Sequence, residues 1–339
     1  ISSGLSVAIY WIGAYVINDA APTARLPLFS DMVVFMSYAM QVVMGFLLMG
    51  ALFIVLPRTM VSAKRINQVL DLHSSIQNPA QVQLADENLK GQVEFKDVTF
   101  RYAANSEAVI EHVSFRAEAG QTVAFIGSTG SGKSTLVNLI PRFYDVSAGE
   151  ILVDGVNVQD YALEDLRNKV GYIPQKAVLF SGDVKDNLDF GQSQETPLSN
   201  QAMWQALELA QSKSFIEDKE AGLASEVAQG GTNFSGGQRQ RLAIARALAR
   251  KPEILIFDDS FSALDYKTDR VLRQELAEKT KSMTKLIVAQ RISTIMDADL
   301  ILVLDQGKVV GQGTHKELLA NNEVYQEIAY SQLSKEELE

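Results

Sequence analysis

Acidic and basic residues are distributed very unevenly along this chain of 339 residues. Residues 1–57 contain only Asp19, Arg25 and Asp31, so 30 of the 31 Lys and Arg residues and 39 of the 41 Asp and Glu residues lie from Arg58 onward. An uncharged segment of this length suits an apolar environment, whereas the remainder has the charge content of a soluble domain. The sequence therefore predicts two physically different parts.

Two stretches of the N-terminal part approach the thickness of a membrane. Residues 32–57 are 26 residues without a charge, about 39 Å as a helix, against a hydrocarbon core of about 30 Å. Residues 1–18 are also uncharged and end at Asp19. We expect both to be transmembrane helices. A secretory signal peptide is the less favoured alternative, because the N-terminus has no basic n-region and its apolar stretch is too long.

Basic residues follow the second expected span more densely than they precede it. Arg58, Lys64 and Arg65 come directly after it, whereas the loop over 19–31 contains one arginine. The positive-inside rule therefore predicts that the chain leaves the membrane on the cytoplasmic side. Because the chain begins within an apolar run, we expect it to be a fragment of a multi-pass protein of the cell membrane, with further helices upstream.

Beyond the second span the sequence divides into three segments. Apolar spacing predicts a cytoplasmic helical extension over 58–72. Residues 73–91 are poor in large apolar side chains and contain Pro79, which indicates a linker. Residues 92–339 alternate short β-type runs with helical stretches, which is typical of an α/β domain.

Composition excludes several classes of protein. The chain has no cysteine, so it has neither disulfides nor cysteine-ligated zinc or iron-sulfur sites. Its formal net charge of -10 disfavours a nucleic-acid partner, because a phosphate backbone is bound mainly by cations.

The best-defined motif is a glycine-rich loop between an apolar strand over 122–126 and an expected helix over 136–143. The loop reads G-S-T-G-S-G-K-S-T, which is the pattern G-x-x-x-x-G-K-[ST] in its required strand-loop-helix context. Backbone N–H groups can surround phosphates, Lys133 can reach the β and γ oxygens, and the Ser134 hydroxyl can bind Mg²⁺. The sequence thus predicts a P-loop NTPase that binds ATP through Gly127, Ser128, Thr129, Gly130, Ser131, Gly132, Lys133, Ser134 and Thr135.

A second element of an ATP site is an apolar run over 254–257 that ends at Asp258. A buried strand delivers such a carboxylate to the carboxyl edge of its sheet. Apolar strands that end in aspartate are common, so this feature is weak by itself. After a P-loop it predicts that Asp258 holds Mg²⁺ beside Ser134.

The segment N-F-S-G-G-Q at 233–238, followed by a helical run over 239–250, narrows the class. It resembles the L-S-G-G-Q signature of ATP-binding-cassette transporters, with Phe234 in the leucine position. Its serine and glycine amides open a helix and suit an anion. The resemblance implies a mixed sheet with a helical subdomain, and a head-to-tail dimer. In that dimer each ATP lies between one P-loop and the opposite signature, here Ser235, Gly236, Gly237 and Gln238.

Further matches follow in family order. Tyr102 resembles the aromatic residue that stacks on adenine, and Gln175 resembles the Q-loop glutamine that reaches Mg²⁺, the attacking water and the coupling helices of the membrane domain. Asp265, in S-A-L-D at 262–265, corresponds to the D-loop at the dimer interface. Residues 225–231 partly match an exporter motif, which favours an exporter over an importer.

Two residues depart from the family pattern. The position of the catalytic glutamate is Asp259, whose side chain is one methylene, about 1.5 Å, shorter. The position of the switch histidine is Gln290, which can hydrogen-bond a γ-phosphate but has no titrating nitrogen. Both changes weaken the same step, so we favour an impaired site over tolerated variation. The residues expected to act in hydrolysis are Asp259, Gln290, Gln175, Ser235, Gly237 and Asp265, and those expected to bind Mg²⁺ are Ser134, Gln175 and Asp258.

These features resemble the degenerate-site subunit of a heterodimeric bacterial multidrug exporter. The resemblance implies a second half-transporter as partner, membrane lipid around the spans, a transported small molecule and no nucleic acid. A soluble cassette ATPase is disfavoured by the uncharged span over 32–57. An ATP-gated regulatory membrane subunit and a lipid or peptide exporter remain alternatives.

The expected span is also lined with Met32, Met36, Met40, Met44 and Met49, the first four of which form one stripe at i, i+4 spacing. A flexible thioether face suits an apolar cavity for varied substrates. Helix packing or lipid contact explains the stripe equally well.

Overall fold

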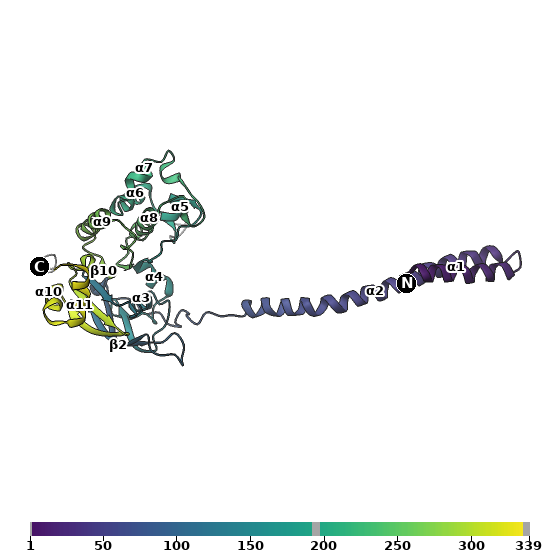
Figure 1. Cartoon of the computed structure of the whole chain (residues 1–339), viewed down its shortest axis with the longest axis horizontal. Coiled ribbons are helices and arrows are strands. Elements are labelled where there is room, and N and C mark those ends of the chain that lie inside the picture. Colours follow the sequence, from purple (N-terminus) through teal and green to yellow (C-terminus); the bar gives the residue numbers. More distant parts are fainter. Residues whose placement is uncertain (1, 192–196, 335–339) are drawn as a thin grey trace. The chain divides into compact units, whose positions relative to one another are not determined.

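The computed structural model describes residues 2–191 and 197–334, which form two separate units (Figure 1). One unit comprises residues 1–75 and the other residues 76–339. The division after Ser75 falls inside the segment that the sequence predicts as a linker.

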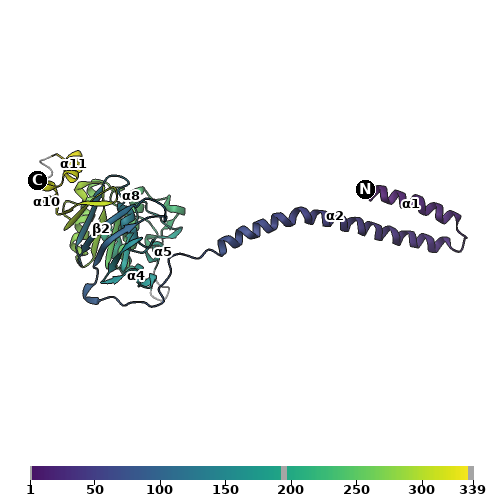
Figure 2. The same ribbon diagram turned by 90° about the horizontal axis from the view of Figure 1, so that it is seen from below.

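The first unit is a hairpin of two helices, α1 (Ser2–Asp19) and α2 (Arg25–Leu70). Figure 2 shows α1 folded back along the first part of α2. Arg25 closes the hairpin, because its guanidinium donates hydrogen bonds of 3.2 Å to the carbonyl oxygens of Ala20 and Asn18. Carbonyl groups at a helix end lack partners within the helix, and Arg25 supplies them.

The packing of α1 on α2 accounts for part of the methionine stripe. The Met32 side chain lies against Gly13, where a Cβ would meet its sulfur, so a larger residue at this position would displace the Met32 side chain. Among the five methionines that line the span, Met32, Met36 and Met40 are half-buried. Met44 and Met49 are exposed. Helix packing therefore explains the first three, and the other two keep both interpretations.

Helix α2 contains both the expected span over 32–57 and most of the expected helical extension over 58–72. It is one continuous helix of 46 residues that begins seven residues before the expected span and ends two residues before the expected end. The helix continues through Pro57, although proline cannot donate to the carbonyl four residues earlier. Thr59 donates from its hydroxyl to the carbonyl oxygen of Val55 at 3.1 Å, which adds a hydrogen bond in the same turn.

Of the helices in the described part of the chain, α2 alone is long and apolar enough to cross a membrane. Residues 2–18 of the other expected span do form a helix, but α1 falls short of this criterion, and residue 1 lies outside the described residues. The structure thus supports one candidate span rather than two.

The second unit is built on two large sheets. An antiparallel sheet has the order β2-β1-β4-β5, with β1 (Val93–Phe100), β2 (Ile110–Ala117), β4 (Ala148–Val153) and β5 (Val156–Asn157). The main sheet has the order β12-β11-β3-β10-β9-β6, with β3 (Thr122–Gly127), β6 (Val170–Ile173), β9 (Ile254–Asp258), β10 (Thr284–Val288), β11 (Leu300–Asp305) and β12 (Lys308–Gly313). Only the edge strand β12 is antiparallel to its neighbour within the main sheet. This mixed sheet confirms the α/β fold class.

Strand β3 shows why the sequence has no polar alternation there. Val123 and Phe125 face the core shared with the antiparallel sheet, whereas Ala124 and Ile126 face the core on the other side. All four are at most 1% exposed. A strand covered on both faces reads as a continuous apolar run.

Helices cover both faces of the main sheet, and Figure 1 shows α5 to α8 gathered on one side of the domain. The helices are α3 (Lys133–Leu139), α4 (Leu163–Lys169), α5 (Val184–Asp189), α6 (Asn200–Leu209), α7 (Lys213–Glu217), α8 (Gly236–Ala249), α9 (Tyr266–Lys279), α10 (His315–Asn321) and α11 (Glu323–Gln332). A short ladder joins β7 (Gly182–Asp183) to β8 (Glu226–Val227) near these helices.

The helix expected over 136–143 begins and ends earlier, as α3 over 133–139. It begins earlier because the Lys-Ser-Thr end of the P-loop supplies its first turn. It ends earlier because Pro141 cannot donate a backbone hydrogen bond and Arg142 adopts a φ of +52°.

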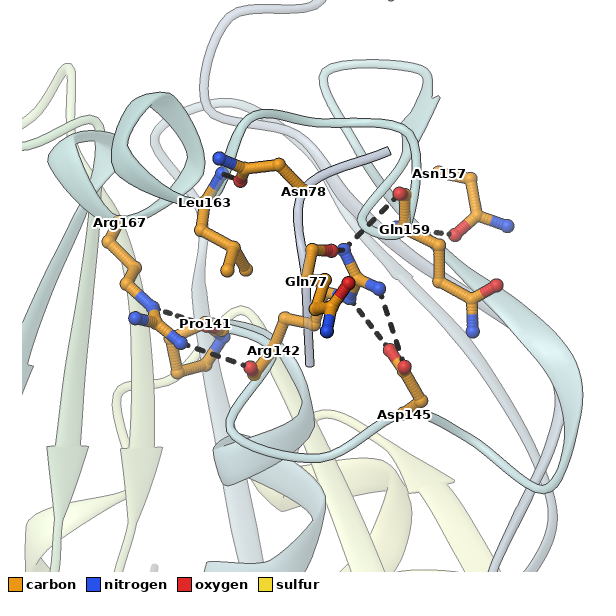
Figure 3. A network of polar contacts seen from close by, with 9 residues as sticks. All are labelled: Gln77, Asn78, Pro141, Arg142, Asp145, Asn157, Gln159, Leu163 and Arg167. Atoms are coloured by element: carbon orange, nitrogen blue, oxygen red, sulfur yellow. Dashed lines mark hydrogen bonds and ion pairs between the residues drawn. The ribbon is translucent and has the colours of Figure 1, made fainter. Parts of the chain in front are cut away.

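The expected linker over 73–91 is fastened to the domain at several points. Figure 3 shows Arg142, which is buried, donating from its guanidinium to the carbonyl oxygen of Gln77 at 3.1 Å and forming an ion pair with Asp145 at 2.7 Å. The Asn78 side chain accepts a hydrogen bond of 2.8 Å from the backbone N–H of Leu163. The segment that follows α3 and the first residue of α4 thus hold residues 77–78 on the domain through hydrogen bonds.

Candidate ATP-binding site

Four adjacent parallel strands bring distant parts of the sequence to one edge of the main sheet. The P-loop follows β3, Gln290 follows β10, Asp259 follows β9 and Gln175 follows β6. Ligands bind at the carboxyl ends of such strands. Here these segments line a cavity of about 250 Å³.

The P-loop turns tightly at Gly132, which adopts a φ of +97°. A Cβ at this position would lie 2.7 Å from Cδ1 of Ile110 and 2.9 Å from the carbonyl oxygen of Val109. Glycine is therefore required both by the backbone conformation and by the space available. The turn sets the first residues of α3 against the cavity.

Lys133 is the cation of this cavity and is only 8% exposed. Its Nζ donates to the carbonyl oxygens of Gly127 at 2.9 Å and Ser128 at 2.8 Å. Burial lowers the pKa of Lys133, against the opposing charges of Asp259 and Asp258. A phosphate would supply further negative charge, so binding an anion favours the protonated ammonium.

The predicted pair of Mg²⁺ ligands lies side by side. The Ser134 hydroxyl donates to Oδ1 of Asp258 at 2.6 Å, and the Tyr172 hydroxyl donates to Oδ2 at 3.0 Å. Mg²⁺ at nucleotide sites takes one or two carboxylates together with phosphate oxygens and waters, so these oxygens fit it. Within the described part of the chain, no group of three or more His, Asp or Glu side chains could hold a metal ion by itself. A bound nucleotide would therefore complete the site.

Both departures from the family pattern meet at a single oxygen atom. Gln290 donates from Nε2 to Oδ2 of Asp259 at 2.7 Å, and Gln175 donates from Nε2 to the same oxygen at 2.9 Å. Asp259 is 7% exposed and adopts a φ of +48°. Gln175, predicted as an Mg²⁺ ligand, thus contacts Asp259, whereas Asp258 is held by Ser134 and Tyr172.

Opposing effects act on the pKa of Asp259. Burial raises the pKa of Asp259, and the neighbouring charge of Asp258 raises it further. Hydrogen bonds from Gln175 and Ser262, and the charge of Lys133, act to lower this pKa. The net direction is upward, so the folded protein disfavours the ionised carboxylate relative to a solvated aspartate.

Tyr102 lies at the rim of this site with 53% of its surface exposed. Its hydroxyl is hydrogen-bonded to Oγ1 of Thr135 at 2.9 Å, and its ring lies edge-on to Phe100 and Tyr144. The P-loop thus has an exposed aromatic ring beside it, where the sequence predicts adenine stacking.

The signature turn is built as a helix cap on the surface of the domain. The Ser235 hydroxyl accepts from the backbone N–H of Gln238 at 3.2 Å, and the Gln238 side chain accepts from the N–H of Ser235 at 2.9 Å. This capping box begins α8 three residues before the expected helix. Ser235 and Gly236 are exposed, and Gly237 is half-buried. Among the described residues that line the P-loop cavity, none belongs to this turn.

Asp265 is also placed by a helix cap. Its carboxylate accepts a hydrogen bond of 3.0 Å from the backbone N–H of Thr268, at the first turn of α9. This bond holds the pKa of Asp265 below its usual value. The side chain is exposed.

Comparison with known families agrees with this geometry. The family model described as ABC transporter matches residues 110–262, which include the P-loop, Asp258 and the signature turn. The chain carries an ABC transporter nucleotide-binding domain. The nucleotide-binding domain therefore binds ATP, typically with Mg²⁺.

Curated relatives resemble almost the whole chain. An uncharacterised ABC transporter ATP-binding protein of Mycobacterium bovis is 43% identical over 327 residues, which are 96% of this chain and 55% of the relative. An ATP-dependent lipid A-core flippase of Xanthomonas oryzae is 40% identical over 322 residues, which are 95% of this chain and 53% of the relative. The chain thus spans about half the length of the curated relatives it matches.

A solved structure of a bacterial Atm1-family ABC exporter with ATP bound has the same fold. The TM-score is 0.79 at 29% identity, over 98% of this chain and 58% of the exporter chain. The likeness therefore extends to the helical hairpin as well as to the nucleotide-binding domain.

Two residues of the site are absent from the sequence-based prediction. Tyr172 donates a hydrogen bond from its hydroxyl to Asp258. Its position in the strand just before the Q-loop, two residues before Pro174, is a local feature that could have identified it as a residue of the site. Gln332 contacts the backbone of Gln290 from more than 40 residues away. No local pattern indicates that contact.

Proposed function

We propose that this chain forms part of one half of an ABC exporter, in which its P-loop builds a slow ATP site and its signature turn completes a faster site on a second, different half-transporter. The first unit contributes α1 and α2 to the membrane domain, and residues 92–339 lie in the cytoplasm. The transported molecule is a lipophilic compound, and a name shared by several relatives, lipid A-core flippase, favours a lipid among the candidates.

The observation that carries the proposal is the pair of hydrogen bonds that Gln175 and Gln290 donate to Oδ2 of Asp259, here called the clasp on Asp259. A general base must present a carboxylate oxygen to the attacking water at about 2.6–3.2 Å. Asp259 is one methylene shorter than the family's glutamate, and its Oδ2 already accepts from Gln175 and Gln290. A misplacement of about 1 Å can cost a hundredfold in rate.

The chain's own residues still support binding. Lys133 and the P-loop amides would hold the phosphates, and Ser134 and Asp258 would hold Mg²⁺, which neutralises charge on the phosphates when bound. Gln290 would donate its amide to the γ-phosphate, but it cannot accept and release a proton as a histidine does. Binding without rapid hydrolysis is the expected result.

The exposed signature turn supports a site shared between chains. Ser235, Gly236 and Gly237 offer a hydroxyl and backbone amides at the N-terminus of α8, where an anion is favoured. Among the described residues, none in this turn lines the chain's own P-loop cavity. The nucleotide that meets the turn is therefore the one bound to the P-loop of the partner.

A groove beside Gln175 is the proposed contact with the membrane domain. Its volume is about 340 Å³, and its lining includes Phe143, Phe180 and Phe190, which are 43–51% exposed. Arg246 lies against the rings of Phe180 and Phe190. We propose that coupling helices of the exporter dock on these aromatic rings, next to the Q-loop.

The test uses the full-length subunit with and without its partner. We expect the subunit alone to bind ATP but to hydrolyse it slowly, and the pair to hydrolyse it rapidly. Ser235→Ala in this chain should then lower the activity of the pair by about tenfold or more, whereas Thr232→Ala, an exposed neighbour outside the turn, should have no such effect. Equal rates for the isolated subunit and the pair would refute the proposal.

The clasp on Asp259 also fits an ATP-gated regulatory subunit. That function requires a nucleotide-dependent conformational change without coupled turnover, even with the partner present. Measuring ATP hydrolysis and transport by the same pair distinguishes the two functions.

A further inference from the structure

The last residue of the C-terminal helix reaches the loop that carries Gln290. Gln332, at the end of α11, donates from Nε2 to the carbonyl oxygen of Gln290 at 2.8 Å. Its Oε1 accepts from the backbone N–H of Ile292 at 2.9 Å. One side-chain amide therefore satisfies the backbone on both sides of Arg291, as a neighbouring strand would.

The helix that carries Gln332 is itself held firmly. Tyr325 and Ala329, on the two preceding turns of α11, are fully buried. The Tyr325 hydroxyl is hydrogen-bonded to Nδ1 of His315 at 2.6 Å, which ties α11 to α10. The position of Gln332 is thus set by the core of the domain.

The other side of the same loop faces the ATP site. The side chain of Gln290 donates to Oδ2 of Asp259 at 2.7 Å, while its carbonyl oxygen accepts from Gln332. The loop is short, since β10 ends at Val288 and the following 3-10 turn begins at Ile292. A short loop held at both faces has little freedom to rotate.

We infer that Gln332 is a positioning residue, which holds the Gln290 loop so that the Gln290 amide stays within reach of the γ-phosphate. Helix α11 thereby influences the ATP site without touching nucleotide. This inference rests on the proposed role of Gln290 at that site.

Three variants of the full-length pair separate this role from a general loss of stability. Gln332→Ala removes both hydrogen bonds, and Gln332→Glu keeps an acceptor for Ile292 but sets a carboxylate against the Gln290 carbonyl. The control is Gln326→Ala, on the same helix, which removes a single hydrogen bond of 2.8 Å to the carbonyl oxygen of Leu319. Steady-state hydrolysis at this chain's site is measured as kcat and KM for ATP, with the partner's P-loop inactivated.

We expect Gln332→Ala and Gln332→Glu to lower kcat about fivefold to tenfold, because the displaced Gln290 amide loses about one hydrogen bond to the γ-phosphate in the transition state, with KM for ATP within about twofold. Gln326→Ala should leave kcat unchanged. In a Gln290→Ala background, Gln332→Ala should have no further effect, because its action passes through Gln290.

Hydrogen-deuterium exchange gives a readout that does not depend on turnover. Amides of residues 289–295 should exchange faster in Gln332→Ala, whereas residues 232–240 of the signature should be unchanged. An equal loss of kcat with and without Gln290, or unaltered exchange over 289–295, would overturn the inference. If the pair fails the tests of an exporter but exchange over 289–295 still rises, the proposed function fails and the positioning of the loop stands.

Discussion

The residues around the P-loop cavity and those of the signature turn at 234–238 are here called the P-loop half and the signature half of the ATP machinery. Their polar side chains find hydrogen-bond partners in opposite ways. Lys133, Asp258 and Asp259 are 7–8% exposed and find hydrogen-bond partners in several segments of this chain. Ser235 is exposed, and its capping bonds stay within its own turn. One half is thus a buried network that depends on the whole domain, and the other is a local surface turn prepared for another molecule.

The departures from the family pattern are distributed accordingly. Asp259 and Gln290 both lie in the P-loop half and contact each other directly. The departure in the signature, Phe234, is 3% exposed and packs with Phe215 beneath the turn, where Lys219 lies over its ring. The residues that differ in chemistry from the family pattern thus lie in the P-loop half, whereas the signature half keeps its helix cap at Ser235.

Removing the cation of the P-loop should have the largest effect. Lys133→Ala takes away the charge that meets the β and γ phosphates, so we expect ATP affinity at this chain's site to fall about a hundredfold. Titration of the full-length subunit with a fluorescent ATP analogue measures this loss. Ser235→Ala in the same assay should leave affinity within about twofold, and a comparable loss for both variants would break the distinction between the halves.

Arginine anchors should matter more in the P-loop half. Arg142→Ala leaves Asp145 and the Gln77 carbonyl without a buried partner, and we expect a cost of about 2 kcal/mol in the free energy of unfolding. Arg239, which donates to the carbonyl oxygen of Phe234 at 2.7 Å, is its half-buried counterpart. Urea unfolding of Arg239→Ala should show a cost of about 1 kcal/mol or less. A larger cost for Arg239 would invert the comparison.

The stability contributed by Asp259 should depend on pH. Its folded-state pKa is raised by burial, so the ionised carboxylate destabilises the fold at pH values above the unfolded pKa of about 3.9. Asp259→Asn should therefore raise the free energy of unfolding at pH 7 by up to about 1 kcal/mol. The gain should shrink as pH falls through the raised folded-state pKa and should vanish below the unfolded pKa of about 3.9, where the carboxyl group is protonated in both states. A variant that is less stable at pH 7 would contradict this sign.

The signature's own departure should have only a small effect on stability and on hydrolysis. Phe234→Leu restores the family residue but leaves space against Phe215 and removes the ring beneath Lys219, so we expect a loss below about 1.5 kcal/mol. Hydrolysis by the pair should change by less than about threefold, because the Ser235 cap is unaffected. A tenfold change would show that Phe234 shapes the turn.

Much of the fold and of the site could be predicted because its signals are local. The P-loop reads directly as strand, loop and helix, and Asp258 follows a strand whose apolar residues are all buried. The start of α10 is also locally determined, since the Thr314 and Glu317 side chains form a capping box within four consecutive residues. In each case a few consecutive residues contain the whole physical reason.

The remaining features depend on contacts between distant segments. That Gln175 and Gln290 converge on one oxygen of Asp259 follows from the adjacency of β6, β9 and β10, which no single stretch of sequence encodes. The anchoring of Gln77 by Arg142 requires the linker to return to the domain.

The central claim is that the geometry around Asp259 makes this chain's ATP site slow. The direct test is single-turnover hydrolysis at that site, in the full-length pair with the partner's P-loop inactivated, for the unsubstituted chain and for Asp259→Glu. We predict that Asp259→Glu raises the single-turnover rate about tenfold or more, and that adding Gln290→His raises it further. Asp258→Glu, the matched control one residue earlier, should lower the rate. An unsubstituted site that already hydrolyses ATP as fast as the Asp259→Glu variant would contradict the account.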